Sequence, residues 1–205
     1  MNIGIIGSGN VGTALGAGWL KAGHKVSYGV REPGANNRGE AHESIRKADF
    51  LSVSDASNDN EVIVLTTPSH IVKELIPVMG TLEGKIVIDA TNSVRLRPEP
   101  YRTAFHAFRD LVPGAKMVKC FNSTGFENMR NPKYPDESID MFMAGSDAEA
   151  KETASGLSRD LGFENCYDFG GDDKVELLEQ FALSWINLAI MQGQGRDIAF
   201  KLVRR

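Results

Sequence analysis

Three glycines near the start of the chain are spaced in a way that suits the binding of a dinucleotide. Gly7, Gly9 and Gly12 form the pattern G-x-G-x-x-G between a short apolar run and a helical pattern that continues to Leu20. The first glycine permits a tight turn off a strand, the second lets a pyrophosphate approach the backbone, and the third lets the helix pack close to the strand. The phosphates would bind N–H groups at the positive end of the helix. The residues expected to bind the pyrophosphate are Gly7, Ser8, Gly9, Asn10, Val11 and Gly12.

The end of the second predicted strand bears on which nicotinamide dinucleotide is bound. An acid at this point hydrogen-bonds the ribose 2′-hydroxyl of NAD, whereas an arginine accommodates the 2′-phosphate of NADP. Arg31 comes first after the strand, and Arg38 lies further along the following loop. Glu32 could instead hydrogen-bond a ribose or point to water, and Arg31 could be a solvated loop charge. We favour NADP, because guanidinium matches phosphate in a bidentate way.

Small and polar residues also follow three later strands, at the points where each strand ends. In a doubly wound sheet, these carboxyl ends face the cofactor across the switch point. The residues expected beside the ribose and nicotinamide are Thr66, Thr67, Pro68, His70, Thr91, Asn92, Asn122, Ser123 and Thr124. Two alternatives stay open here. A lone histidine is often a surface or packing residue, and Asn92 could simply cap its own turn.

The elements that must position these residues alternate between strands and helices. Apolar runs predict strands over 3–6, 25–30, 61–66, 85–89, 116–121, 141–144 and 163–169. Helical patterns cover 11–22, 69–79, 101–111, 147–161 and 174–191. This order predicts an α/β fold with a doubly wound, mostly parallel sheet, extra C-terminal strands and a long C-terminal helix.

The last helix has a broad apolar stripe that includes Leu178 and Trp185, and such a surface must be covered. We therefore divide the chain into a dinucleotide-binding domain over 1–171 and a C-terminal helical segment over 172–205. The segment is expected to pack on that domain or on a second subunit.

Composition excludes several classes of protein. The chain of 205 residues has a net charge of −4, which argues against a nucleic-acid or anionic-membrane partner. No apolar run approaches membrane-spanning length, and the early first strand leaves no room for a signal peptide, so we expect a cytoplasmic protein. Cys120 and Cys166 lie in apolar runs and predict buried thiols, not a disulfide framework or a metal site.

The predicted crevice has no obvious acid–base pair and no separate substrate domain. Reduction of a carbonyl needs a proton delivered alongside the hydride, and His24, His42 and Lys119 do not fall at crevice positions. Hydride transfer to a flavin-like ring needs little from the protein beyond two stacked cofactors. We therefore expect no catalytic side chain, and hydride exchange between NADPH and a small-molecule redox acceptor.

Short motifs across nearly the whole chain carry a resemblance to a known family. They are Gly7-Ser8-Gly9-Asn10-Val11-Gly12, Gly29 with Arg31, Thr66-Thr67-Pro68, Asp89-Ala90-Thr91-Asn92, Val118-Lys119-Cys120-Phe121-Asn122, Phe126-Glu127-Asn128-Met129 and Gly193-Gln194-Gly195. With these motifs the chain resembles the NADPH-dependent deazaflavin (coenzyme F-420) reductases and the related cytosolic oxidoreductase domain of membrane ferric reductases.

The resemblance implies a Rossmann domain with extra strands and a C-terminal helix, commonly a homodimer. It also implies NADP pyrophosphate at Ser8 to Val11, the 2′-phosphate at Arg31, and nicotinamide near Thr67, Pro68, Asn92 and Asn122. A second cofactor would stack on the nicotinamide, bounded by residues 122–124 and the last helix. Coenzyme F-420, FAD, FMN and an unknown acceptor are all open as its identity.

Two other functions fit the same sequence. One is a non-catalytic NADP sensor whose apolar last helix binds a partner. The other is a small imine or hydroxyacid reductase completed by dimerisation, which would need a proton donor near Asn122, such as Lys119 or His106.

Overall fold

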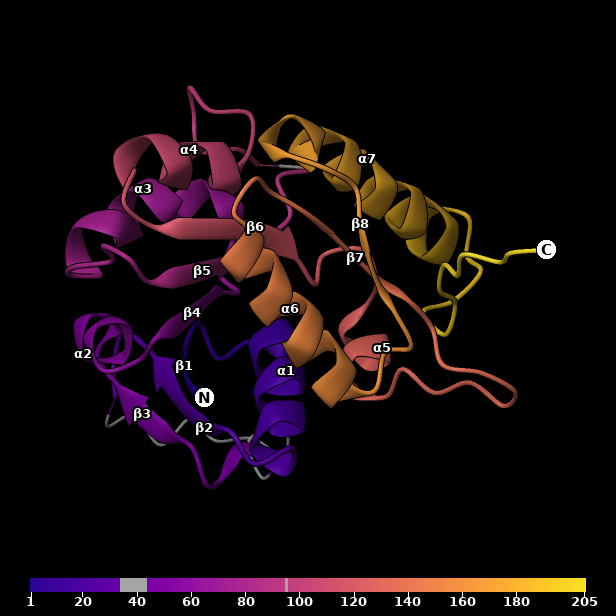
Figure 1. The fold of residues 1–205 in the computed structure, drawn as a ribbon, viewed down its shortest axis with the longest axis horizontal. Helices are drawn as coiled ribbons and strands as arrows, with labels where there is room; N and C mark the ends of the chain where they lie inside the picture. The colour runs from indigo at the N-terminus through magenta and orange to yellow at the C-terminus, as the bar shows by residue number, and fades with distance from the viewer. Residues whose placement is uncertain (34–43, 95) are drawn as a thin grey trace.

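The strands predicted around the glycine turn belong to one eight-stranded sheet. The computed structural model describes residues 1–33, 44–94 and 96–205, so Arg38 lies outside the described residues. The strands lie in the order β3-β2-β1-β4-β5-β6-β7-β8 (Figure 1). They are β1 (Asn2–Ile6), β2 (Lys25–Gly29), β3 (Asp49–Leu51), β4 (Val62–Leu65), β5 (Ile86–Asp89), β6 (Lys116–Cys120), β7 (Met141–Ala144) and β8 (Cys166–Asp168). All neighbouring strands pair in parallel except β6 and β7, which confirms the predicted fold class.

Helices cover both faces of the sheet. They are α1 (Asn10–Lys21), α2 (Val53–Asn58), α3 (Val72–Leu75), α4 (Ala104–Leu111), α5 (Phe126–Arg130), α6 (Ala148–Leu161) and α7 (Val175–Ile186), with short 3-10 turns η2 (Ser69–Ile71), η3 (Ile76–Val78) and η4 (Asp172–Lys174) and a π-helical turn η5 (Asn187–Met191). One core cluster joins the sheet to α1, α5 and α6, and a second joins it to α2, α3, α4 and α7. In Figure 1, α6 crosses in front of the sheet beside α1. There Trp19 donates a hydrogen bond from Nε1 to the carbonyl of Leu157 at 3.0 Å.

Several element boundaries differ from those expected from the sequence. The helix predicted over 69–79 is broken into η2, α3 and η3. The α-helical part ends at Leu75, because Pro77 has no N–H to continue it. Helix α2 was not expected from the sequence. In the structure, the side chain of Ser52 caps this helix by accepting a hydrogen bond from the backbone N–H of Asp55. The helix predicted over 174–191 begins at Val175 and gives way to the π-helical turn at Asn187.

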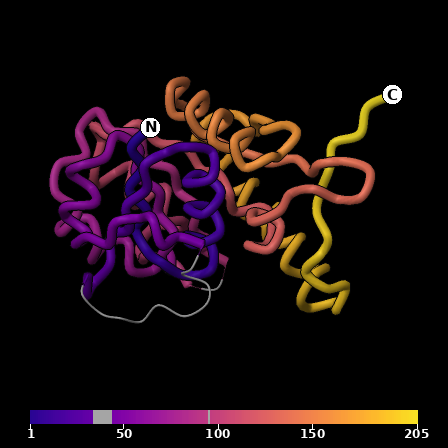
Figure 2. Tube along the Cα trace, turned by 90° about the horizontal axis from the view of Figure 1, so that it is seen from below, coloured from indigo at the N-terminus to yellow at the C-terminus, as the bar shows by residue number. Residues whose placement is uncertain are grey.

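The C-terminal end of the chain crosses the segment over 131–140 (Figure 2). Lys201 donates from Nζ to the carbonyl of Ser138 at 2.8 Å, and the backbone N–H of Leu202 donates to Asp140 at 2.9 Å. Among the described residues, we find no helix with the length and apolar character needed to cross a membrane.

Candidate cofactor cleft

The turn between β1 and α1 is braced by the end of β4. Gly7 has a φ of +110°, a conformation that favours glycine, and its N–H donates to the carbonyl of Gly29 at 3.1 Å. The hydroxyl of Thr66 donates to the carbonyls of Ile6 and Gly7, at 3.1 and 2.9 Å. A Cβ at Gly12 would lie 2.3 Å from the Gly7 carbonyl oxygen. Gly7 and Gly12 are therefore required by the geometry of the turn itself.

Gly9 has a different role, because its surroundings are open. It is the N-cap of α1, with φ −74° and ψ −170°, and it provides no side-chain cap for the helix. A Cβ added at this position would meet no atom within 4 Å. The positive end of a helix of 12 residues therefore faces open space above a bare backbone. This arrangement fits a pyrophosphate, as the sequence predicts.

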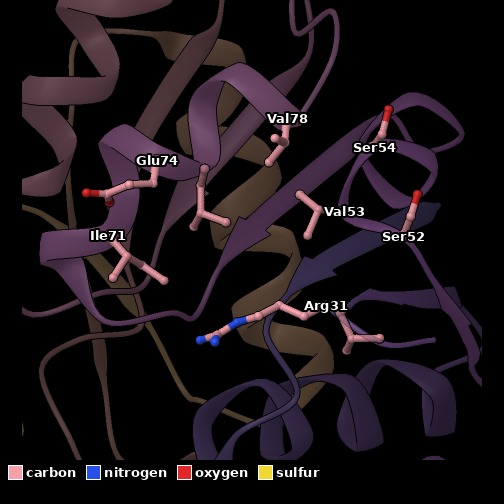
Figure 3. Close-up of a pocket in the computed structure, with 9 residues that line it drawn as sticks. Arg31, Ser52, Val53, Ser54, Ile71, Glu74 and Val78 are labelled. Carbon is pink, nitrogen blue, oxygen red and sulfur yellow. The ribbon is translucent and has the colours of Figure 1, made fainter. Parts of the chain in front are cut away.

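A cavity of about 330 Å³ begins at this turn. Its walls are Ile6, Gly7, Ser8, Gly9, Gly29, Val30, Arg31, Val53, Thr66, Thr67, Pro68, Ile71 and Leu75. It shares five of these residues with a neighbouring cavity of about 550 Å³, whose further walls include Ser52, Ser54, Glu74 and Val78 (Figure 3). We call the two cavities together the cofactor cleft. Its outer part has largely aliphatic walls, which suit a flat apolar ring such as a purine.

Arg31 lines the cofactor cleft, and its charge is unpaired among the residues that the structure describes. Its side chain is exposed, and it forms no ion pair or hydrogen bond with any residue that the structure describes. In Figure 3 the guanidinium points into the space beneath Ile71, whereas the carboxylate of Glu74 points away from it. Glu32 is exposed and does not line the cleft. The cleft therefore presents a free cation where a 2′-phosphate is expected.

Most of the predicted site residues fall into two groups, one at the cofactor cleft and the other after β5 and β6. Those lining the cofactor cleft are Gly7, Ser8, Gly9, Arg31, Thr66, Thr67 and Pro68. Asn10, Val11 and Gly12 form the first turn of α1, directly after Gly9. His70 is exposed on η2 and does not line the cleft. The remaining five, Thr91, Asn92, Asn122, Ser123 and Thr124, lie after β5 and β6 and form the second group.

Residues of the second group contact one another across neighbouring strand ends. Asn92 donates from Nδ2 to the carbonyl of Asn122 at 3.5 Å, and Asn122 donates from Nδ2 to Oδ1 of Asn92 at 3.4 Å. The hydroxyl of Thr91 and the Oδ1 atom of Asn122 are buried without a hydrogen-bond partner among the residues that the structure describes. Because unpaired buried polar atoms are costly, these two atoms are suited to a polar ligand such as a carboxamide.

The backbone before Asn122 is held in an unusual conformation. Phe121 has a φ of +64°, and among the described residues no other amino acid except glycine has a positive φ. Its ring is fully buried and lies edge-on to Trp19, with ring centroids 5.7 Å apart. Packing therefore maintains a conformation that most side chains disfavour, and such positions cluster at functional sites.

A buried ion cluster lies behind the second group, and the sequence did not predict it. Lys119 Nζ pairs with Oδ2 of Asp89 at 3.0 Å and with Oε1 of Glu179 at 2.7 Å. It also donates to the carbonyl of Thr91 at 2.6 Å. Asp89 accepts from the N–H of Thr91, and Glu179 accepts from the N–H of Ser93, both at 2.9 Å. We call Lys119, Asp89 and Glu179 the buried ion cluster.

The two residues considered as proton donors are both engaged elsewhere. Lys119 is fully buried. Burial alone lowers the pKa of its amine, but Asp89 and Glu179 outweigh burial and raise the pKa above its usual value. His106 lies on α4, where Nδ1 is 2.8 Å from the hydroxyl of its helix cap, Thr103. Neither residue lines the cofactor cleft.

The chain is similar in sequence to part of two metalloreductases. Human metalloreductase STEAP2 is 26% identical over 164 residues, which make up 80% of this chain and 32% of the relative. Rat metalloreductase STEAP3 is 26% identical over 163 residues, which make up 78% of this chain and 32% of the relative. The chain thus spans about a third of the length of these relatives.

Solved structures share the fold over most or all of the chain. A candidate F420-dependent NADP reductase from Arthrobacter sp. FB24 superposes with a TM-score of 0.86 at 24% identity, and the match covers 100% of both chains. A reductive aminase from Aspergillus terreus in complex with NADPH gives a TM-score of 0.69 at 19% identity, over 94% of this chain and 62% of the other.

The family model described as NADP oxidoreductase, coenzyme F420-dependent, matches residues 2–93. This stretch contains the glycine turn, Arg31, the end of β4 and Asn92. The resemblance to the coenzyme F420-dependent NADP oxidoreductases is therefore confirmed.

Proposed function

We propose that this protein is an NADP-dependent oxidoreductase that transfers hydride between NADPH and a flavin or deazaflavin acceptor such as coenzyme F-420. The observation that carries the proposal is the cofactor cleft, which runs from the bare N-terminus of α1 to the exposed guanidinium of Arg31. It presents a helix end for the pyrophosphate, an aliphatic slot for the adenine and a cation for the 2′-phosphate.

The choice of acceptor is supported by the environment of the two possible proton donors. Lys119 is buried within its ion cluster, and His106 is bonded to Thr103. Neither is free to protonate a carbonyl or imine during the transfer. When bound, NADPH would supply a hydride, which is two electrons and one proton, and the acceptor would take any second proton from water. The role of this chain is then to hold two rings in contact.

The reaction is tested by NADPH oxidation against FMN, FAD and coenzyme F-420, with NADH assayed in parallel. We expect turnover with one ring system and a preference for NADPH. Tight NADPH binding without turnover on any of these acceptors would contradict the proposed reaction.

Substitution of Arg31 tests the cofactor specificity. We expect Arg31→Ala to weaken NADPH binding about tenfold, because a charge-assisted hydrogen bond to the phosphate is lost. NADH binding should be unchanged, since NADH has no 2′-phosphate. Titration calorimetry with both nucleotides measures the difference. Arg159→Ala, which removes an exposed charge on α6, is the matched control and should alter neither affinity. Equal losses for NADPH and NADH in Arg31→Ala would contradict this role.

A second candidate function is favoured by exposed apolar residues near the end of the chain. Leu177, Leu188, Ile190 and Met191 are each at least 40% exposed on α7 and η5. These residues would support a homodimer in the enzyme, or a partner interface in a non-catalytic NADP sensor. Light scattering with and without NADPH separates the two functions. A sensor should change its assembly when nucleotide binds and show no turnover, whereas the enzyme should turn over in an unchanged assembly.

A further inference from the structure

The buried ion cluster contains more negative than positive charge. It has one ammonium group and two carboxylates, and the three side chains are at most 6% exposed. Glu179 also lines a small cavity, whose other charged walls among the described residues are Arg97, Arg102 and Glu176. Arg102 is paired with Glu176 at 2.9 Å, and Arg97 is exposed. Among the described residues, no second buried cation compensates the cluster, although buried charge is costly unless compensated.

The cluster is attached to the backbone on both sides of Asn92. Lys119 and Asp89 bind the carbonyl and the N–H of Thr91, and Glu179 binds the N–H of Ser93. Asn92, between them, contacts Asn122. This is the segment beside which the nicotinamide is expected, as the family resemblance implies. The excess negative charge therefore lies directly behind it, in a region where water screens little.

The two forms of the cofactor differ in charge at the ring. Oxidised nicotinamide is a cation, whereas the reduced ring is neutral. A fixed negative charge behind the ring lowers the free energy of the oxidised form and leaves the reduced form nearly unaffected. We infer that the buried ion cluster strengthens the binding of NADP⁺ relative to NADPH and thereby favours release of the hydride. This inference rests on the proposed function, because it requires the nicotinamide to bind beside Asn92.

The test is the ratio of two dissociation constants, measured by titration calorimetry for NADP⁺ and for NADPH. Glu179→Gln keeps an oxygen that can accept from Ser93 and removes one negative charge. We expect it to weaken NADP⁺ binding about tenfold relative to NADPH, because one negative charge that acts on the cationic ring is removed in a region of low effective dielectric constant. Asp89→Asn removes a charge on the opposite side of Lys119 and should shift the ratio in the same direction. Thermal unfolding identifies which of the two variants is folded, and one folded variant is sufficient.

Glu176→Gln is the matched control, because it removes the same charge from the exposed surface one helical turn earlier on α7. It should leave the ratio unchanged. If Glu179→Gln weakens both nucleotides by the same factor, or neither, the inference is overturned while NADP binding stands. If the unsubstituted protein binds neither nucleotide, the proposed function is overturned, and the inference with it.

Discussion

Replacement of Gly9 by alanine should remove tight NADPH binding and leave the stability of the protein unchanged. The backbone of Gly9 is extended, so any residue can adopt its conformation, and an added Cβ would meet no protein atom within 4 Å. The methyl group would instead occupy the space in which the pyrophosphate must approach the N–H groups of α1. We expect the affinity for NADPH to fall on the order of 100-fold, the size of effect that a displacement of about 1 Å has at a preorganised site. Calorimetric titration and thermal unfolding measure the two properties separately.

Gly12→Ala is the informative comparison, because at this position the same added methyl group would meet protein atoms at close range. Its Cβ would lie 2.3 Å from the carbonyl of Gly7 and 2.8 Å from the hydroxyl of Thr66. The turn must shift, and we expect a loss of about 1–3 kcal/mol in the free energy of unfolding, as for other overpacked sites. If Gly9→Ala binds NADPH as tightly as the parent, the pyrophosphate does not bind above this turn.

Replacement of Lys119 by methionine should destabilise the fold by about 3–5 kcal/mol, because two carboxylates are then left without their buried cation. The raised pKa of the Lys119 amine makes the stability of the fold depend on pH. The folded protein holds this proton more tightly than the unfolded chain, so the stabilisation is complete below the ordinary pKa of 10.5 and is lost as the pH rises through the higher folded-state pKa. Urea unfolding at neutral pH, followed by circular dichroism, measures the effect.

Lys116 provides a control on the same strand. Its amine pairs with Glu149 at the surface, where an ion pair contributes little to stability, so Lys116→Met should unfold at nearly the same urea concentration as the parent. Combining Lys119→Met with Asp89→Asn and Glu179→Gln should restore much of the stability, since no uncompensated charge remains. If Lys119→Met and Lys116→Met are equally stable, the prediction is wrong, because Asp89 and Glu179 then do not need the ammonium group of Lys119.

The parts of the site that follow from the sequence are those encoded by neighbouring residues. The spacing of Gly7, Gly9 and Gly12 predicts a turn whose geometry the structure contains. The position of Arg31 after β2 predicts a cation in the cleft. In both cases the information lies within a few residues of one strand end, so no knowledge of the tertiary structure is needed.

The buried ion cluster could not be predicted in this way, because its residues come from β5, β6 and α7. Asp89 and Lys119 are paired in register on adjacent strands, but Glu179 reaches them only after α7 has packed on the sheet. A lysine within an apolar strand is a signal that a partner is required, and it does not identify that partner. The hydroxyl of Thr66 was likewise expected beside the ribose, yet it donates to the backbone of the glycine turn.

Strand β7 runs antiparallel to β6, and this direction decides where the segment between the two strands begins and ends. The chain enters along β6, which ends at the cofactor edge of the sheet, and leaves from the same edge along β7, because these two strands are antiparallel. Both ends of the intervening segment, residues 121–140, are therefore anchored beside the crevice. Insertions or deletions within it can remodel the acceptor side without altering the strand register that holds the dinucleotide. One short strand reversal thus lets the segment over 121–140 vary in length while the strands beside the glycine turn keep their register.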